Sequence, residues 1–148
     1  MAYGVLVSTH LDDSVYRTRL RAVQQAASTA GIDALLVTPG PDLRYLTGYE
    51  AVPLERLTCL VLPSAGDPVM VVPGLEVLAA KASPIGVLGL TLHAWGETDD
   101  PVSLVASLLP GASTIALDDH MWAEKVLRLR AAMPGARQVI AGPIIHPL

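Results

Sequence analysis

Asp118, Asp119 and His120 are three consecutive side chains of the types that bind metal ions or transfer protons. Successive residues rarely converge on one ion without ligands from elsewhere, and a helix N-terminus also favours carboxylates. Two further acid pairs, Asp12-Asp13 and Asp99-Asp100, likewise precede segments that we predict to be helical. We therefore interpret all three acid pairs as helix caps.

The four histidines and the single cysteine form no recognisable catalytic set. No two histidines are four residues apart, so we expect no zinc site built within this chain. Cys59 lies among apolar neighbours, which is typical of a core thiol, and it has no partner for an internal disulfide. G-x-S-x-G, P-loop and G-x-G-x-x-G motifs are absent, so the sequence predicts neither a serine nucleophile nor a phosphate loop.

Two aromatic segments offer a choice between packing and recognition. Tyr45 and Tyr49 are four residues apart, so in an extended chain they share a face. That segment is either a half-buried edge strand or a strand end that lines a ligand or subunit surface. Trp95, which follows His93 and precedes a polar turn, is either a core residue or an interface anchor.

Apolar spacing and turn residues predict the elements that position these side chains. Tyr16, Leu20, Val23, Ala27 and Ala30 form one stripe of a first helix, which Gly31 ends. We expect further helices over 74–83, 102–109 and 119–133, strands over 34–38, 57–63, 68–73, 114–118 and 137–141, an extended segment over 45–49 and a tail over 142–148. Residues 86–95 are one strand, or a loop and a strand over 91–95.

The order of these elements predicts a three-layer α/β domain. The 57–73 segment reads as a hairpin, which forces one antiparallel pair, so we expect a mixed sheet. In the last helix, Trp122, Val126, Leu129 and Met133 recur at spacings of 4, 3 and 4, which predicts that they face the sheet. A chain of 148 residues is most simply one domain.

Composition narrows the function classes. Apolar residues make up 51% and charged residues 16%, which fits either a large apolar core or a surface that faces another domain or subunit. The net charge of −4 and the lack of a basic stripe argue against nucleic-acid binding. No run of 18 apolar residues and no signal peptide is present, so we expect no membrane span and a cytoplasmic location.

Three patches resemble the N-terminal domain of the creatinase, prolidase and aminopeptidase P family. They are Tyr16-Arg-Thr-Arg-Leu20 with Gly31-Ile-Asp33, the segment Asp42-Leu-Arg-Tyr-Leu-Thr-Gly-Tyr49, and Trp95-Gly-Glu-Thr-Asp-Asp-Pro101. The second patch is the most specific. The resemblance covers about residues 14–142 and implies a mixed, roughly six-stranded sheet between helices, with a topology similar to ribonuclease H.

The resemblance also implies a function without bond chemistry in this chain. In the family, a following "pita-bread" domain binds two Mn²⁺, Co²⁺ or Zn²⁺ ions that activate water, and we expect that domain to be absent after Leu148. The N-terminal domain mediates dimer or larger homo-oligomer contacts and narrows an active-site entrance. The matching positions are Asp42, Tyr45, Tyr49, His93 and Trp95.

We expect the parent to hydrolyse Xaa-Pro bonds. A creatinase-type C–N hydrolase parent and a stand-alone α/β binding module remain alternatives.

Overall fold

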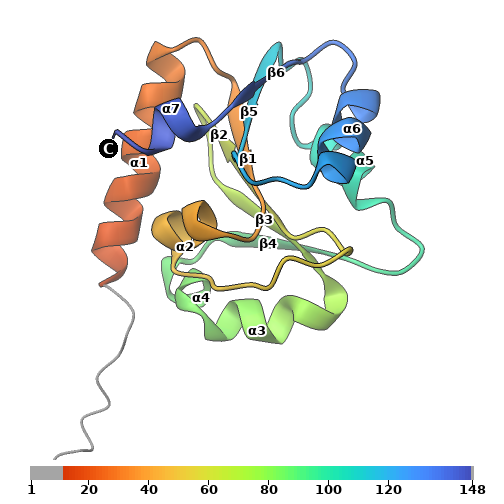
Figure 1. Cartoon of the computed structure of the whole chain (residues 1–148). Coiled ribbons are helices and arrows are strands. Elements are labelled where there is room, and N and C mark those ends of the chain that lie inside the picture. Colours follow the sequence, from red (N-terminus) through yellow and green to blue (C-terminus); the bar gives the residue numbers. More distant parts are fainter. Residues whose placement is uncertain (1–11, 148) are drawn as a thin grey trace, which may run out of the picture.

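Strand β1 (Ala34–Val37) lies in the middle of the sheet, because all four of its side chains are apolar and buried. In the computed structural model, which describes residues 12–147, the strand order is β4-β3-β2-β1-β5-β6 (Figure 1). β1 pairs antiparallel with β2 (Cys59–Pro63) and parallel with β5 (Thr114–Leu117). The prediction of a mixed, six-stranded sheet is therefore confirmed.

The outer strands complete a sheet in which only β2 is reversed. β3 (Val69–Pro73) is antiparallel to β2 and parallel to β4 (Thr91–Trp95), and β6 (Arg137–Ile140) is parallel to β5. The carboxyl ends of β1, β3, β4, β5 and β6 consequently lie along the same side of the sheet. Open α/β sheets bind their ligands at this side.

Helices cover both faces of the sheet (Figure 1). One apolar cluster contains residues of α1, α2, α3, α4 and α7, and the second contains residues of α5 and α6. The bounds are α1 (Asp13–Thr29), α2 (Pro41–Thr47), α3 (Val77–Ala82), α4 (Pro84–Leu88), α5 (Pro101–Ser107), α6 (Ala123–Ala132) and α7 (Gly142–Ile145), with a short 3-10 turn, η2 (Gly74–Glu76), before α3. The layers match the predicted three-layer architecture.

The first helix and its caps agree with the sequence interpretation. Tyr16, Leu20, Val23 and Ala27 are buried, and Gly31 has a φ of 74°, whereas Ala30 is exposed. Asp12 Oδ1 accepts a 2.8 Å hydrogen bond from the Ser14 amide, and Asp100 Oδ1 accepts one of 3.0 Å from Val102. Two of the three predicted acid caps are therefore present.

The extended segment predicted over 45–49 is wrong, because residues 41–47 form helix α2. Pro41 occupies the first turn and Gly48 ends the helix with a φ of 75°, a pair of signals that is typical of short helices. Leu43 and Leu46 are fully buried against the core that α1 covers. That burial outweighs the β-propensity of the Tyr-Leu-Thr sequence.

The prediction that Trp122 faces the sheet is also wrong. Helix α6 begins at Ala123, and Trp122 is its N-cap residue with non-helical dihedral angles. The side chain of Trp122 therefore leaves the stripe of the helix and is 44% exposed. Leu129 and Met133 are buried as predicted, whereas Val126 is half-buried.

Two short helices lie where no helix was expected. Residues 84–88 form α4, which Ser83 caps through the Ile85 amide, and β4 begins only at Thr91. Residues 142–145 form α7 rather than an irregular tail. Of the helices within residues 12–147, none is long and apolar enough to cross a membrane.

We predict that Gly48→Ala destabilises the fold more than Gly89→Ala does. Both glycines have a left-handed φ, 75° and 69°, so both variants carry the same backbone strain of about 1 kcal/mol. A Cβ at Gly48 would lie 2.8 Å from the Tyr16 ring and from Pro84 Cγ, whereas one at Gly89 would meet nothing within 4 Å. The crowding should add about 1–3 kcal/mol to the loss of unfolding free energy that Gly48→Ala causes, as measured by urea unfolding. Equal losses at the two positions would contradict this packing.

Candidate functional site

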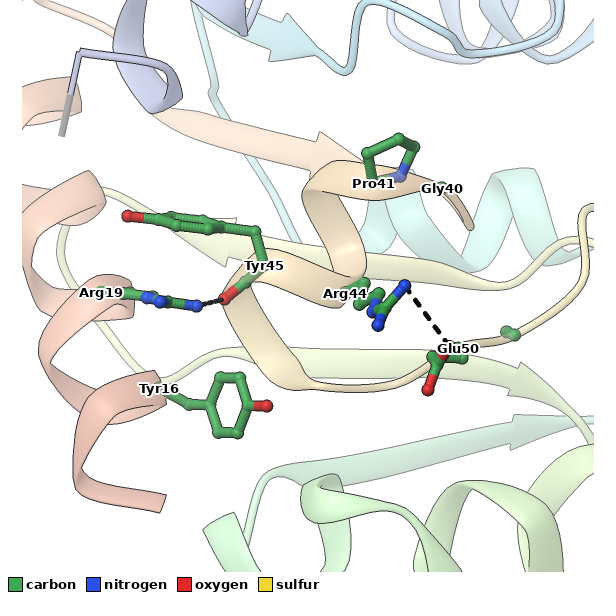
Figure 2. Close-up of a pocket in the computed structure, with 8 residues that line it drawn as sticks. Tyr16, Arg19, Gly40, Pro41, Arg44, Tyr45 and Glu50 are labelled. Carbon is green, nitrogen blue, oxygen red and sulfur yellow. Dashed lines mark hydrogen bonds and ion pairs between the residues drawn. The ribbon is translucent and has the colours of Figure 1, made fainter. Parts of the chain in front are cut away.

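Tyr45, one of the predicted site residues, stacks on a guanidinium from α1. Arg19 Cζ lies 4.0 Å from the centroid of the Tyr45 ring, and Arg19 Nη1 donates a 2.8 Å hydrogen bond to the Tyr45 carbonyl oxygen (Figure 2). The ring of Tyr16 lies 5.9 Å from the same guanidinium. Cation–π attraction and the hydrogen bond together fix α2 against α1.

An open cavity of about 520 Å³ lies beside this stack (Figure 2). Its lining consists of Tyr16, Arg19, Gly40, Pro41, Arg44, Tyr45, Glu50 and Ala51. Arg44 Nη1 is 3.7 Å from Glu50 Oε1, and because both side chains are more than half exposed the ion pair contributes little stability. Guanidinium and aromatic groups of this kind suit contact with another protein surface.

Asp42 joins α2 to the last helix. Its Oδ1 atom is 3.1 Å from His146 Nε2, while its Oδ2 atom is buried and has no hydrogen-bond partner within residues 12–147. Asp42 and Tyr45 also line a second cavity, of about 360 Å³, together with Pro41, Ile145 and His146. The structure therefore brings two of the predicted site residues together with a histidine that the sequence interpretation left unassigned.

Asp118 does not cap a helix, contrary to the interpretation of the third acid pair. Its Oδ2 atom accepts hydrogen bonds from the Thr38 amide at 2.7 Å and the Thr38 hydroxyl at 2.6 Å, and its Oδ1 atom accepts one from the His120 amide at 3.0 Å. Asp119 Oδ1 accepts a 2.8 Å hydrogen bond from the Gly142 amide. The two carboxylates thus tie the ends of β1 and α7 to the end of β5.

The pKa of Asp118 is raised above its ordinary value. Burial is the main cause, and the charge of Asp42 adds to it, whereas the hydrogen bonds from Thr38 and His120 act in the opposite direction. Burial likewise raises the pKa of the Cys59 thiol far above its usual range. Cys59 is fully buried, which supports its interpretation as a core thiol.

The other three predicted site residues line neither of these two cavities. Tyr49 is buried in the core, where burial and the charge of Glu76 raise its pKa. His93 is exposed on β4, the edge strand, and Trp95 at the end of β4 is partly buried. Trp95 Nε1 donates a 2.9 Å hydrogen bond to the Leu57 carbonyl oxygen, so the indole ties β4 to the segment before β2.

Sequence reasoning missed the apolar surface of the segment between α2 and β2. Val52 is 67% and Leu54 50% exposed, and Trp122 is exposed as well. The sequence offered one signal for this exposed surface, because the apolar stretch lies outside any predicted helix or strand.

No group of three or more His, Cys, Asp or Glu side chains within residues 12–147 is arranged to hold a metal ion.

Comparison with known proteins gives consistent matches along the chain. The model of the creatinase/prolidase N-terminal domain family matches residues 19–148. The probable dipeptidase PepE of Mycobacterium tuberculosis is 42% identical over 142 residues, which are 95% of this chain and 38% of that protein. The chain thus spans 38% of the length of this curated relative.

Solved structures show the same fold. The crystal structure of dipeptidase PepE from Mycobacterium ulcerans superposes with a TM-score of 0.88 at 42% identity, over 94% of this chain and 38% of that one. The N-terminal domain of an X-Pro dipeptidase from Streptococcus pyogenes, solved alone, has a TM-score of 0.76 at 22% identity and is covered to 98%. Domains with this fold therefore form without the rest of their proteins.

We predict that the stability advantage of the wild type over Asp118→Asn grows as the pH falls from 7 towards 4. Because the folded pKa of Asp118 is raised, its buried negative charge costs stability at neutral pH. Proton uptake by the folded state removes that cost as the pH falls through the folded pKa towards the ordinary value of 3.8. Urea unfolding of both proteins across this pH range measures the difference.

Asp33→Asn is the matched control, with the opposite sign. Asp33 accepts hydrogen bonds from the Thr114 and Ser113 amides, which lower its pKa. The contribution of Asp33 to the free energy of unfolding is fully present above pH 3.8 and is lost as the pH falls through its lowered pKa. The stability advantage of the wild type over Asp33→Asn should therefore not grow between pH 7 and pH 4. An Asp118→Asn difference that shrinks on acidification would contradict the assignment.

Proposed function

Because this chain belongs to the creatinase/prolidase N-terminal domain family, we propose that it serves as the non-catalytic N-terminal domain of an Xaa-Pro dipeptidase or aminopeptidase P-like metallohydrolase. In this proposal the parent protein hydrolyses the Xaa-Pro peptide bond in a domain that follows the chain. Two divalent ions, Mn²⁺, Co²⁺ or Zn²⁺, supply an activated water in that domain. The chain itself supplies contacts and shape.

One observation carries this proposal. The match with dipeptidase PepE runs through 95% of this chain but through only 38% of the relative. The lack of a metal-binding group within residues 12–147 is compatible with chemistry placed elsewhere. A domain that forms alone, as the streptococcal structure does, can act as a separate unit within a longer protein.

We further propose that the domain contributes to homo-oligomer contacts and to the active-site entrance. The exposed apolar side chains of Val52 and Leu54 support a contact surface, because isolated domains rarely leave such groups uncovered together. Tyr45, His93 and Trp95 take part through their surface atoms, whereas Asp42 is largely buried and takes part through its contact with His146. Tyr49 takes part only from beneath, since its side chain is buried.

The proposal predicts that the chain can replace its counterpart in a relative. A chimera in which residues 12–147 substitute for the matched segment of Mycobacterium ulcerans dipeptidase PepE should fold and retain the dipeptidase activity of PepE. The 148-residue chain alone should show no turnover of Xaa-Pro dipeptides with added Mn²⁺, because residues 12–147 contain no group of three or more ligand side chains that could hold an ion.

PepE without its N-terminal segment is the control, and it should lose solubility or activity. A soluble but inactive chimera, beside active PepE, would contradict the assignment of this chain to a peptidase. Turnover by the 148-residue chain that survives repurification would contradict its non-catalytic role.

A further inference from the structure

A crevice opens between the carboxyl ends of β1 and β5. The two strands are parallel neighbours, but the chain leaves β1 for α2 on one face of the sheet and leaves β5 for α6 on the other. Figure 1 shows α2 and α6 on opposite sides of this strand pair. Such a switch point is where open α/β sheets bind small molecules.

A cavity of about 180 Å³ occupies this crevice and adjoins the cavity beside Arg19, with which it shares Gly40 and Pro41 as lining residues. Its walls are mainly apolar, with Pro39 and Pro41 on the side of β1 and Leu54, Leu57 and Trp122 around the rest. At about 30 Å³ for each water, the space equals about six water molecules. A space of this size and lining suits a compact, mostly apolar molecule.

Lys125 places a positive charge at this cavity. The residue is 5% exposed, and its Nζ atom donates a hydrogen bond to the Glu55 carbonyl oxygen and lies 3.0 Å from Glu124 Oε1. An ammonium group has three N–H donors; beside these two oxygens, the ammonium also lies 6.0 Å from the centroid of the Trp122 ring. Its counter-charge is on Glu124, whose side chain is 55% exposed and can exchange with water or with another carboxylate.

Two further polar side chains line the cavity. Thr58 is 6% exposed, yet its hydroxyl has no hydrogen-bond partner among the described residues. His120 is exposed, and its ring likewise has no partner within residues 12–147. Among the described residues, only Asp42 Oδ2 is a fully buried side-chain atom without a partner, so the Thr58 hydroxyl is open to solvent and can donate a hydrogen bond to a molecule in the cavity.

We propose that this cavity binds a small monocarboxylate with a compact apolar body. The carboxylate accepts hydrogen bonds from the Lys125 ammonium and the Thr58 hydroxyl and replaces Glu124 as the counter-charge. The apolar body lies between the proline wall and the Trp122 ring. A single buried cation matches one negative charge, so a dianionic phosphate would leave charge uncompensated. This site does not depend on the proposed role in a metallohydrolase.

Nuclear magnetic resonance titration of the ¹⁵N-labelled chain with cyclopentanecarboxylate at constant ionic strength tests the site. We expect saturable shifts at the resonances of Thr58, His120, Trp122 and Lys125. The uncharged isostere cyclopentanecarboxamide should bind about tenfold more weakly or worse, because it lacks the charge that pairs with Lys125.

Lys125→Met should abolish binding of the carboxylate, since it keeps the stem and removes the ammonium. Lys81→Met is the matched control, because Lys81 is the only other lysine of the chain and is exposed on α3. Trp122→Ala removes an exposed residue of the cavity wall, so it should weaken binding several-fold and leave the far-UV circular dichroism unchanged. This variant keeps the test decisive if Lys125→Met disturbs folding.

Three results would overturn the proposal. They are the absence of saturable shifts, equal affinity for the carboxylate and the carboxamide, and shifts that map to the cavity beside Arg19 instead. Unchanged binding by a folded Lys125→Met or Trp122→Ala variant would also overturn it.

Discussion

The parallel pair formed by β1 and β5 is apolar on both faces, and the arrangement of the other elements depends on covering it. Every side chain of β1 is fully buried, and Ile115, Ala116 and Leu117 of β5 are buried too. A sheet of this kind needs a helical layer on each face. The chain meets this need by leaving β1 and β5 in opposite directions, and the crevice at their carboxyl ends is the geometric result.

The charged side chains at this edge form hydrogen bonds and ion pairs with other residues of the protein. Asp118 is buried and receives three hydrogen bonds, which offset part of the cost of its desolvation, although its pKa stays raised. Lys125 is compensated by a backbone carbonyl and by Glu124. Asp42 is satisfied at one oxygen only, through His146. These hydrogen bonds and ion pairs fix the positions of the segments at this edge, which apolar packing alone does not specify.

The sheet and its hydrogen bonds hold the groups along this edge in fixed positions. Loops and short helices at the carboxyl ends present apolar and aromatic groups, while the sheet keeps them in fixed positions. Trp95 ties β4 to the segment before β2, and Arg19 ties α2 to α1. Contacts built on such fixed positions lose little conformational entropy when another domain binds.

Local signals in the sequence determined the first helix, the β2–β3 hairpin, the caps at Asp12 and Asp100, and the α/β class. Each depends on spacing or capping within a few residues, so no knowledge of the fold is needed. The family resemblance added the expectation of the six-stranded sheet. Helix α2 was missed although Pro41 and Gly48 signal it, because Tyr-Leu-Thr also suits a strand and the burial of Leu43 and Leu46 decides between the two.

Only the tertiary structure decided the site. The partner of Asp118 is Thr38, 80 residues away, and the partner of Asp42 is His146, 104 residues away. Which distant side chains meet depends on strand order and on the face to which each helix crosses. Apolar periodicity specifies that a strand is buried but not which strand is its neighbour. The sequence therefore predicted the layers, whereas the tertiary structure determined which charged side chains lie together.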